Sequence, residues 1–273
     1  MNIFNIANIV AKLPIPYSFW YKLEKISVYC KGQGYNQEDN IIHEVGHIDS
    51  IIKTKMPIVL YDIGANKGQY TAAFLDQFKG FVKKVYMFEP EPTLFKELCN
   101  IFSKNPSISL SEKALSDKPG LSILSAPTSG SLYGSLVDRD TSRYGFKMAL
   151  KWEVETVRFD EYCDEKAVLE LNNSSIIKVL KMDVEGHEMN VLKGMGKYIK
   201  KIDILQFEFG HCHIDSRMFF KDFWDFFNEE SFSIYLITPR GLHKYDEYSD
   251  RYELFLTTNY IAVNNNSTVL KAS

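Results

Sequence analysis

The feature that most constrains the fold is an apolar run that leads into a glycine-containing turn and then into a helix-competent segment. Residues 58–61 read Ile-Val-Leu-Tyr, residues 62–68 read Asp-Ile-Gly-Ala-Asn-Lys-Gly, and a helical pattern covers 70–78. A buried strand, a glycine turn and a helix in this order form the unit with which open α/β sheets bind nucleotides. The sequence therefore predicts a nucleotide-binding α/β domain.

A second strand with an acidic end follows this unit. Residues 85–88, Val-Tyr-Met-Phe, run into Glu89-Pro90, and Glu89 comes 25 positions after Gly64. An acidic residue at the tip of the strand beside the glycine turn can accept hydrogen bonds from the hydroxyls of a ribose. Together, the turn and Glu89 predict a site for an adenosine-bearing cofactor.

The residues of the turn indicate which cofactor this is. Gly64 and Gly68 are separated by Asn66, so the dinucleotide fingerprint Gly-x-Gly-x-x-Gly is not formed, and no phosphate-loop Gly-Lys-Ser/Thr occurs. Asp62 would repel a pyrophosphate, but it suits a cationic ligand that carries an amino acid. S-adenosylmethionine has these properties, and we expect it as the cofactor.

Length and composition fit one large α/β domain with a modest extension. The chain has 273 residues, of which 45% are hydrophobic, and a formal net charge of −3. This net charge gives no indication of a positively charged surface for a phosphate backbone, so nucleic acid is not expected as a partner. Four separated cysteines (Cys30, Cys99, Cys163, Cys212) indicate reduced thiols, and no apolar run is long enough to span a membrane. We expect a cytoplasmic protein whose oligomeric state the sequence leaves open.

The pattern divides the chain into three parts. These are a helical N-terminal extension over 1–55, the nucleotide-binding domain over 56–265 and a tail over 266–273. The first residues lack the cationic start of a signal sequence. Apolar spacing over 3–29 predicts helices that pack on the domain, with contact to a partner or to the inner membrane surface as the alternative.

Further strands and helices alternate after the second strand, and a long loop over 126–150 interrupts them. A functional loop of this length is expected to cover a bound ligand, and the abundant aromatic residues of the last third are expected either in the core or in the acceptor pocket. The pattern predicts a Rossmann-like α/β sandwich of seven strands, parallel except for one antiparallel edge strand. The expected elements after residue 90 are a helix over 92–102, a strand over 108–115, a strand over 176–182, a helix over 188–193, a strand over 202–209, a helix over 217–228 and strands over 233–238 and 253–263.

Four motifs in this order resemble a known family. They are Asp62-Ile-Gly-Ala-Asn-Lys-Gly, Phe88-Glu-Pro-Glu-Pro92, Ala114-Leu-Ser-Asp117 and Lys181-Met-Asp-Val-Glu-Gly-His-Glu188 with Leu192-Lys-Gly194. Over roughly residues 55–265 the chain is similar to the FkbM family of S-adenosylmethionine-dependent methyltransferases. The resemblance implies a class I methyltransferase fold and O-methylation of a small-molecule or glycan acceptor. The expected acceptor is a sugar hydroxyl in a cell-surface polysaccharide or its nucleotide-linked precursor, and a non-sugar natural product is the alternative.

The resemblance also implies roles for individual residues. Glu89 and Pro90 would hold the ribose, and Ala114 and Leu115 would border the adenine. Tyr70 and Thr71, at the start of the following helix, would contact the cofactor, although simple packing is an equal interpretation of Tyr70. The residues expected around the methionine end are Asp62, Gly64, Ala65, Asn66 and Gly68.

The turn after the strand over 176–182 would face the transferred methyl group. An aliphatic hydroxyl is a poor nucleophile, so a positioned base helps as its proton leaves. Glu185 or His187 could take this proton, while Asp183 would orient the cofactor or the acceptor. The alternatives are helix N-terminal charges for Asp183 and Glu185 and a solvent-facing position for His187.

A metal is a second mechanistic hypothesis. Asp183 and Glu208 end adjacent strands and could bind Mg²⁺ through oxygen ligands. His211 and His213 follow and could add ligands or acceptor contacts, but a pair of exposed loop histidines is the ordinary interpretation. We consider a metal possible and do not expect one.

A competing motif lies in the extension. His43-Glu44-Val-Gly-His47 matches the zinc-peptidase signature His-Glu-x-x-His, in which Glu44 would activate a water. Gly46 weakens a helix there, and no further histidine ligand follows at the expected spacing. A cofactor-binding scaffold without turnover is the remaining, non-enzymatic hypothesis. We favour the methyltransferase.

Overall fold

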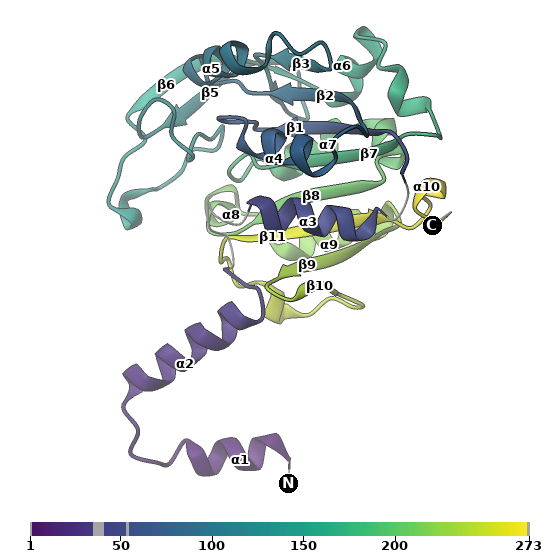
Figure 1. Ribbon diagram of the computed structural model, residues 1–273. Coiled ribbons are helices and arrows are strands. Elements are labelled where there is room, and N and C mark those ends of the chain that lie inside the picture. The colour runs from purple at the N-terminus through teal and green to yellow at the C-terminus, as the bar shows by residue number, and fades with distance from the viewer. Residues whose placement is uncertain (1, 35–40, 53–54, 272–273) are drawn as a thin grey trace.

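The computed structural model describes residues 2–34, 41–52 and 55–271. Residues 1, 35–40 and 53–54 of the expected extension and 272–273 of the expected tail lie outside the described residues. The centre of the molecule is an eight-stranded sheet with the order β10-β9-β11-β8-β7-β1-β2-β3 (Figure 1). Its strands are β1 (Ile58–Ile63), β2 (Val82–Phe88), β3 (Ile108–Ser111), β7 (Ile177–Met182), β8 (Ile204–Phe209), β9 (Phe232–Thr238), β10 (Gly241–Lys244) and β11 (Thr258–Asn264).

Five neighbouring strands, β3, β2, β1, β7 and β8, are parallel, as the sequence predicts. The predicted count of seven strands is wrong, because β9 continues through a short hairpin into an additional edge strand, β10. β10 is the antiparallel strand at the edge, and a second antiparallel strand, β11, lies inside the sheet, between β8 and β9. The sequence predicts a strand over 253–263, but it does not show between which neighbouring strands this strand lies.

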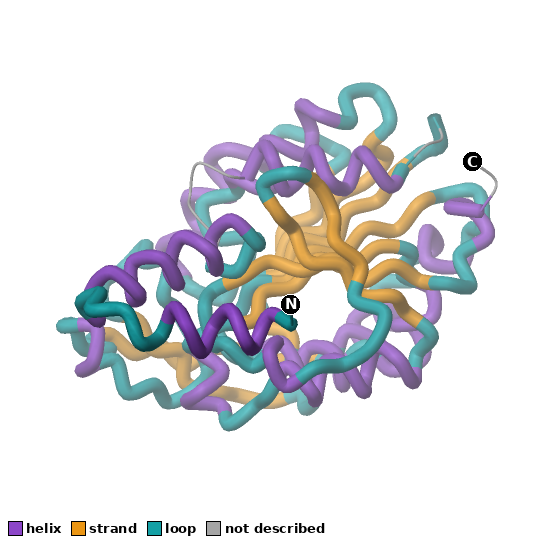
Figure 2. The backbone as a smooth tube through the Cα atoms, turned by 90° about the horizontal axis from the view of Figure 1, so that it is seen from below, coloured by secondary structure: helices purple, strands orange, loops and turns teal. Residues whose placement is uncertain are grey.

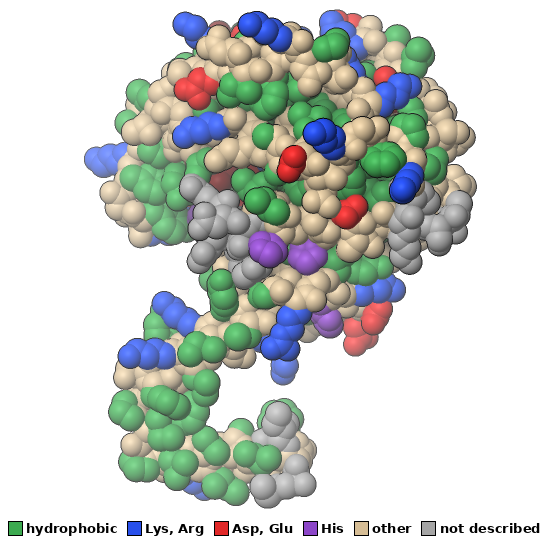
Figure 3. All heavy atoms as spheres, viewed as in Figure 1, with side chains coloured by type: hydrophobic (Ala, Val, Ile, Leu, Met, Phe, Trp, Pro, Cys, Tyr) green, Lys and Arg blue, Asp and Glu red, His purple; other side chains and the backbone are tan. Residues whose placement is uncertain are grey.

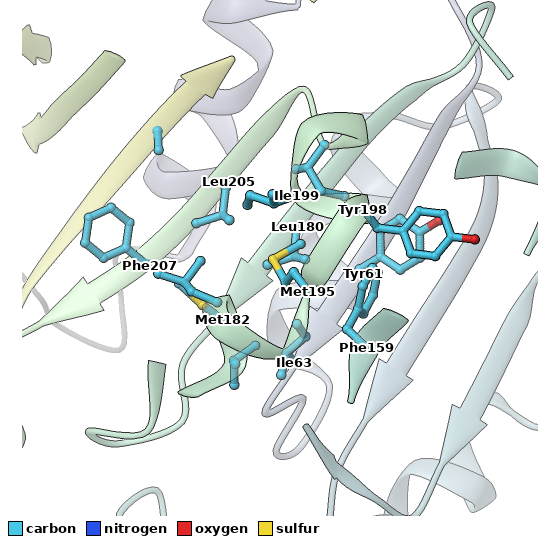
Figure 4. Close-up of a cluster of buried hydrophobic side chains, with 14 of the residues drawn as sticks. Tyr61, Ile63, Phe159, Leu180, Met182, Met195, Tyr198, Ile199, Leu205 and Phe207 are labelled. Atoms are coloured by element: carbon cyan, nitrogen blue, oxygen red, sulfur yellow. The ribbon is translucent and has the colours of Figure 1, made fainter. Parts of the chain in front are cut away.

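Helices cover both faces of the sheet (Figure 2). Every residue of β1, β7 and β8 is buried, which explains why these strands are apolar without strict alternation. One face packs against α3 (Ile41–Ile51), α4 (Gln69–Gln77), α5 (Pro92–Phe102) and α10 (Thr268–Lys271). The other packs against α6 (Phe159–Glu165), α7 (Glu188–Gly194) and α9 (Phe220–Glu229). Figure 4 shows part of this second layer, in which Tyr61 and Phe159 meet edge to face.

The aromatic residues of the last third belong to the core. Phe207 stacks on Phe223 and Tyr260, and Phe209 packs against Phe220. The core interpretation is therefore confirmed for these rings, and no described Phe, Tyr or Trp of the last third lines the cavity at the strand ends.

A second, three-stranded sheet lies beside the first. Its order is β4-β6-β5, from β4 (Ala114–Leu115), β5 (Gly120–Ala126) and β6 (Leu150–Val157). The strand predicted over 108–115 is thus two strands in two sheets. The predicted long loop connects β5 to β6 and contains one short 3₁₀ helix, η2 (Ser142–Tyr144). The remaining short elements are η3 (Leu169–Asn172), η4 (Gly196–Lys201), α8 (Cys212–Ser216) and η5 (Asp250–Tyr252).

The first two helices stand away from the rest of the molecule. α1 (Ile3–Val10) and α2 (Tyr17–Cys30) are separated at Pro14 and Pro16 and project as an arm (Figure 1). No described residue of α2 is buried, so the expectation that 3–29 packs on the domain is wrong. α3 differs, because its Val45 and Ile48 are buried in the core. None of the described helices is long and apolar enough to cross a membrane.

Candidate active site

A cavity of about 380 Å³ opens where β1, β2, β7 and β8 end. The sheet order reverses between β1 and β7, since the chain proceeds from β1 to β2 on one side and from β7 to β8 on the other. Open α/β sheets bind their ligands at such a switch point, outside the carboxyl ends of the strands. The wall includes Gly64, Glu89, Asp183 and Glu208, which follow or end these four strands.

The glycine turn fits tightly against the neighbouring strand end. Gly64 has φ of +74°, and a β-carbon built on it would lie 2.0 Å from the carbonyl oxygen of Asp183. Only glycine can take this conformation at this distance without displacing the backbone. The turn is therefore held directly against the acidic segment that begins at Asp183.

Asp62 lies behind the turn and is fully buried. Its Oδ2 accepts a 2.6 Å hydrogen bond from the Thr71 hydroxyl, and its Oδ1 lies 3.7 Å from Lys181 Nζ. Lys181 also donates to the carbonyl oxygen of Gly64 at 3.2 Å. Asp62 and Thr71 thus brace the turn, and neither belongs to the cavity wall.

Glu89 stands at the tip of β2, where the sequence predicts it. Its Oε2 accepts from the backbone N–H of Asn66 at 2.8 Å, and its Oε1 accepts from that of Glu91 at 2.9 Å. Each carboxylate oxygen keeps a free lone pair for one further donor. Burial raises the pKa of Glu89 to about 7. The carboxylate is fixed in position and faces the cavity, as a ribose-binding group requires.

The structure brings most of the other predicted cofactor residues together. Tyr70 is buried, and its hydroxyl donates to Gln206 at 2.8 Å, so it serves packing and forms part of the wall at once. Gly68 begins α4 and, like Asp62 and Thr71, lies outside the wall. The predicted residues that line the cavity are Gly64, Ala65, Asn66, Tyr70, Glu89, Pro90, Ala114 and Leu115.

The acidic segment after β7 turns abruptly through Gly186, at φ of +99°. Glu188 closes this turn, because its carboxylate accepts from the backbone N–H groups of Val184 at 3.0 Å and Gly186 at 2.9 Å. His213 Nε2 lies 2.9 Å from Glu188 Oε2, and both side chains are fully buried. The expectation of an exposed histidine pair is thus wrong for His213, which supports the turn from behind.

Three carboxylates converge at this end of the cavity: Asp183, Glu185 and Glu208. One oxygen of each lies within 4.8 Å of the others. Burial and then repulsion from Asp183 raise the pKa of Glu185 to about 8, and the same two causes raise the pKa of Glu208 well above its ordinary value. Burial also raises the pKa of Asp183, although 42% of its side chain is exposed, so solvent screening limits this shift. The group can hold protons at neutral pH, and its oxygens could also hold a divalent cation.

The long loop reaches this group through Arg139. Its Nη1 donates to Glu185 Oε2 at 2.6 Å, and its side chain is fully buried. The hydroxyl of Ser135 donates to the carbonyl oxygen of Glu185 at 2.7 Å. Glu185 itself has φ of +54°, an uncommon conformation for a residue with a side chain. The loop therefore fixes both the backbone and the carboxylate of Glu185.

His187 lies on the other side of the same turn. Its Nε2 is 2.9 Å from the hydroxyl of Ser116, which follows β4. Burial lowers the pKa of His187, so the ring is neutral at neutral pH. The residue is half-buried and lines the cavity together with Ala114 and Leu115.

The His-Glu-x-x-His motif receives a different explanation. Glu44 is buried and points into the cavity, where it accepts from Gln206 at 2.7 Å and from Asn259 at 2.8 Å. His43 is exposed, and neither His43 nor His47 lines the cavity. Among the described residues, the side chains close enough to hold a metal together are those of Asp183, Glu185 and Glu208, so the zinc-peptidase hypothesis has no support in this geometry.

The sequence does not predict Lys181, Arg139 or Glu44 as residues of this site. Lys181 is one of two lysines in β7, a strand that is buried along its whole length, and a lysine in such a strand is an available indication. Glu44 stands out in the sequence, but for the chemistry of a zinc peptidase. Arg139 has no distinguishing pattern in a loop rich in Ser and Gly.

The fold and this cavity define an α/β protein with a cavity at the switch point of its sheet. The model of the methyltransferase FkbM domain family matches residues 62–234, which is more than half of the chain. The protein therefore belongs to the FkbM methyltransferase family, as the sequence motifs suggest. The chain matches none of the curated proteins with which it was compared.

Three solved structures to which the chain is similar are distant from it in sequence. An FkbM methyltransferase of Methylobacillus flagellatus is 19% identical, with a TM-score of 0.43; the match covers 76% of this chain and 43% of that one. An O-methyltransferase of Thermotoga maritima is 10% identical (TM-score 0.37, covering 81% and 64%). Fibrillarin of Aeropyrum pernix, with natively bound S-adenosylmethionine, is 13% identical (TM-score 0.41, covering 85% and 76%). The chain thus spans less than half the length of the Methylobacillus protein.

Proposed function

We propose that the protein transfers a methyl group from S-adenosylmethionine to a hydroxyl of a sugar. The observation that carries the cofactor assignment is Glu89, a buried carboxylate fixed by two backbone N–H groups at the tip of β2, 25 residues after the glycine turn. Ala114 and Leu115 offer an apolar border for the adenine, and the turn with Asn66 receives the methionine end. S-adenosylmethionine supplies an electrophilic methyl group on a positively charged sulfur.

The carboxylates at the other end of the cavity suit the reaction in two ways. Negative charge attracts a sulfonium cation. Asp183, Glu185 and Glu208 also have raised pKa values, so an ionised member of the group is a competent acceptor for the hydroxyl proton at neutral pH. We assign the role of accepting the hydroxyl proton to Glu185, which Arg139 holds in place. Asp183 orients the acceptor. His187 contacts Ser116 on the adenine side and is the alternative base.

Polar side chains beside Glu208 favour a hydroxyl-rich acceptor. His211 Nδ1 lies 2.7 Å from the hydroxyl of Thr257, and both residues line the cavity together with Asn259. Such groups can pair with several sugar hydroxyls, while an apolar natural product would leave them unpaired. The acidic wall and the net charge of −3 favour a small or glycan acceptor over nucleic acid.

The test is a product assay with S-adenosylmethionine that carries a ¹³C-methyl group. Nucleotide sugars, cell-surface glycans and non-sugar natural products serve as separate acceptor sets. A ¹³C methoxyl resonance in a sugar product supports the proposal, whereas methyl transfer to nitrogen or carbon contradicts O-methylation. Parallel reactions with a chelator test the carboxylates as metal ligands, and we expect unchanged turnover. Tight cofactor binding without any product would favour the non-catalytic scaffold.

A further inference from the structure

The N-terminal arm, residues 3–31, exposes an unusual amount of apolar surface. Of the 24 large apolar side chains that are exposed in the described chain, ten lie between Phe4 and Tyr29. Figure 3 shows this surface on the projecting arm, interspersed with basic side chains. Soluble proteins rarely leave so large a contiguous apolar surface uncovered, so the arm is built to contact something outside the domain.

Two neighbouring stripes of α2 have different chemistry. Phe19, Leu23, Ile26 and Cys30 follow one another at intervals of four, three and four residues, which places them on one stripe of the helix. Ser18, Lys22, Lys25 and Tyr29 follow at the same intervals on a second stripe, about 100° round the helix from the first. Lys25 Nζ lies 4.6 Å from the centre of the Tyr21 ring. α2 therefore carries an apolar stripe flanked by lysines, and no described residue of the helix is buried.

The charge of the arm differs in sign from that of the chain. Residues 3–31 contain four lysines and one glutamate, a formal charge of +3, while the whole chain carries −3. α1 adds a second short apolar segment with exposed Phe4, Ile6 and Ile9. An apolar stripe flanked by lysines, tyrosines and a tryptophan is typical of helices that lie in the interface of an anionic bilayer.

We propose that the arm docks on the surface of an anionic lipid bilayer. The apolar stripe of α2 and the exposed residues of α1 enter the headgroup region, and the lysines face the anionic headgroups. Docking would leave the cavity at the switch point free, because no arm residue lines it. The proposal concerns location and is independent of the acceptor that the enzyme methylates.

Vesicle sedimentation of the full chain tests this proposal. Vesicles contain either phosphatidylcholine alone or phosphatidylcholine with phosphatidylglycerol, and the variants are Leu23→Glu on the apolar stripe and Ser18→Glu on the neighbouring stripe with the lysines. Both substitutions change the charge by −1 in one exposed helix. On anionic vesicles we expect Ser18→Glu to weaken partitioning about fivefold. Leu23→Glu also loses the burial of a leucine, so we expect a reduction of about fiftyfold or more.

Three outcomes would overturn the proposal. The first is that the wild-type protein stays in solution when anionic vesicles are sedimented. The second is that the two substitutions weaken vesicle binding equally. The third is that the protein does not bind vesicles but forms a concentration-dependent dimer that Leu23→Glu dissociates. The last outcome would assign the arm to a second copy of the chain. Circular dichroism and binding of S-adenosylhomocysteine verify that both variants are folded, since neither residue belongs to the cavity.

Discussion

Replacing Glu89 with glutamine tests the cofactor site most directly. Both carboxylate oxygens accept from a backbone N–H, those of Asn66 and Glu91, so the side-chain amide of glutamine must place an N–H₂ group against one of these donors. One charge-assisted hydrogen bond is lost, which is worth about 1.5–3 kcal/mol, and one ribose hydroxyl loses its acceptor. We expect S-adenosylhomocysteine to bind about 10- to 150-fold more weakly.

The pKa of Glu89 adds a pH dependence to this prediction. Ribose hydroxyls donate to the carboxylate, and this carboxylate takes up a proton below about pH 7. Wild-type affinity should therefore fall as the pH drops from 8 to 6, by about tenfold per unit once the group is protonated. The dependence of stability has the opposite sign. Since the folded pKa exceeds 4.5, the folded state holds the proton between pH 4.5 and 7, and the contribution of Glu89 to stability declines as the pH rises through this window.

The assay is calorimetric titration with S-adenosylhomocysteine at several pH values, together with thermal unfolding. Asp203→Asn is the matched control. Asp203 is also a buried carboxylate that accepts two hydrogen bonds, from Lys178 N at 2.8 Å and from Ser267 Oγ at 2.6 Å, but it lies before β8 and outside the cavity. Both variants should lose stability, and only Glu89→Gln should lose affinity. Equal affinities of the wild type and Glu89→Gln at pH 8 would falsify the assignment of Glu89 to the ribose.

Three further substitutions and one titration test the remaining assignments. Gly64→Ala should lower the free energy of unfolding by at least about 2 kcal/mol, measured in urea, because a β-carbon would lie 2.0 Å from the carbonyl oxygen of Asp183; an unchanged value would refute the tight turn. Asp183→Asn should reduce kcat about 100-fold or more with cofactor affinity little changed, and a near-normal kcat would remove Asp183 from catalysis. Arg139→Gln removes a positive charge that lowers the pKa of Glu185, so the acidic limb of the pH–rate profile should move above about pH 8. If this limb does not move, or if it moves only in a His187→Gln variant, the role of general base belongs to His187. Finally, binding of S-adenosylmethionine should release more protons than binding of S-adenosylhomocysteine, whose sulfur is uncharged. The number of protons released is measured by calorimetry in buffers of different ionisation enthalpy. Equal proton release by the two ligands would contradict the placement of the sulfonium beside carboxylates with raised pKa values.

The sequence predicted those parts of the site that depend on neighbouring residues in the chain. A turn that needs glycine, an acidic strand tip and a helix start are local features, and the parallel order of the strands brings their ends together. Glu44 and Arg139 could not be placed in this way, because their positions depend on how α3 and the long loop pack on the finished sheet. The same reason applies to the position of β11. Its apolar pattern shows that it is buried, but only packing decides that it inserts between β8 and β9.

The electrostatics of the cavity explain how one site can both attract a cation and accept a proton. In the cavity without a cation, burial and mutual repulsion favour the neutral form of Glu185 and Glu208, so their pKa values are raised. A positive sulfur placed beside them lowers those pKa values and drives a carboxylate to ionise. The bound cofactor would thereby produce the ionised carboxylate that the acceptor hydroxyl needs as a base. After methyl transfer the sulfur of S-adenosylhomocysteine is uncharged, so the pKa values of the carboxylates would rise again and the base would be lost. Under the proposed function, buried carboxylates that would destabilise an ordinary core would here provide both specificity for the charged cofactor and catalytic competence.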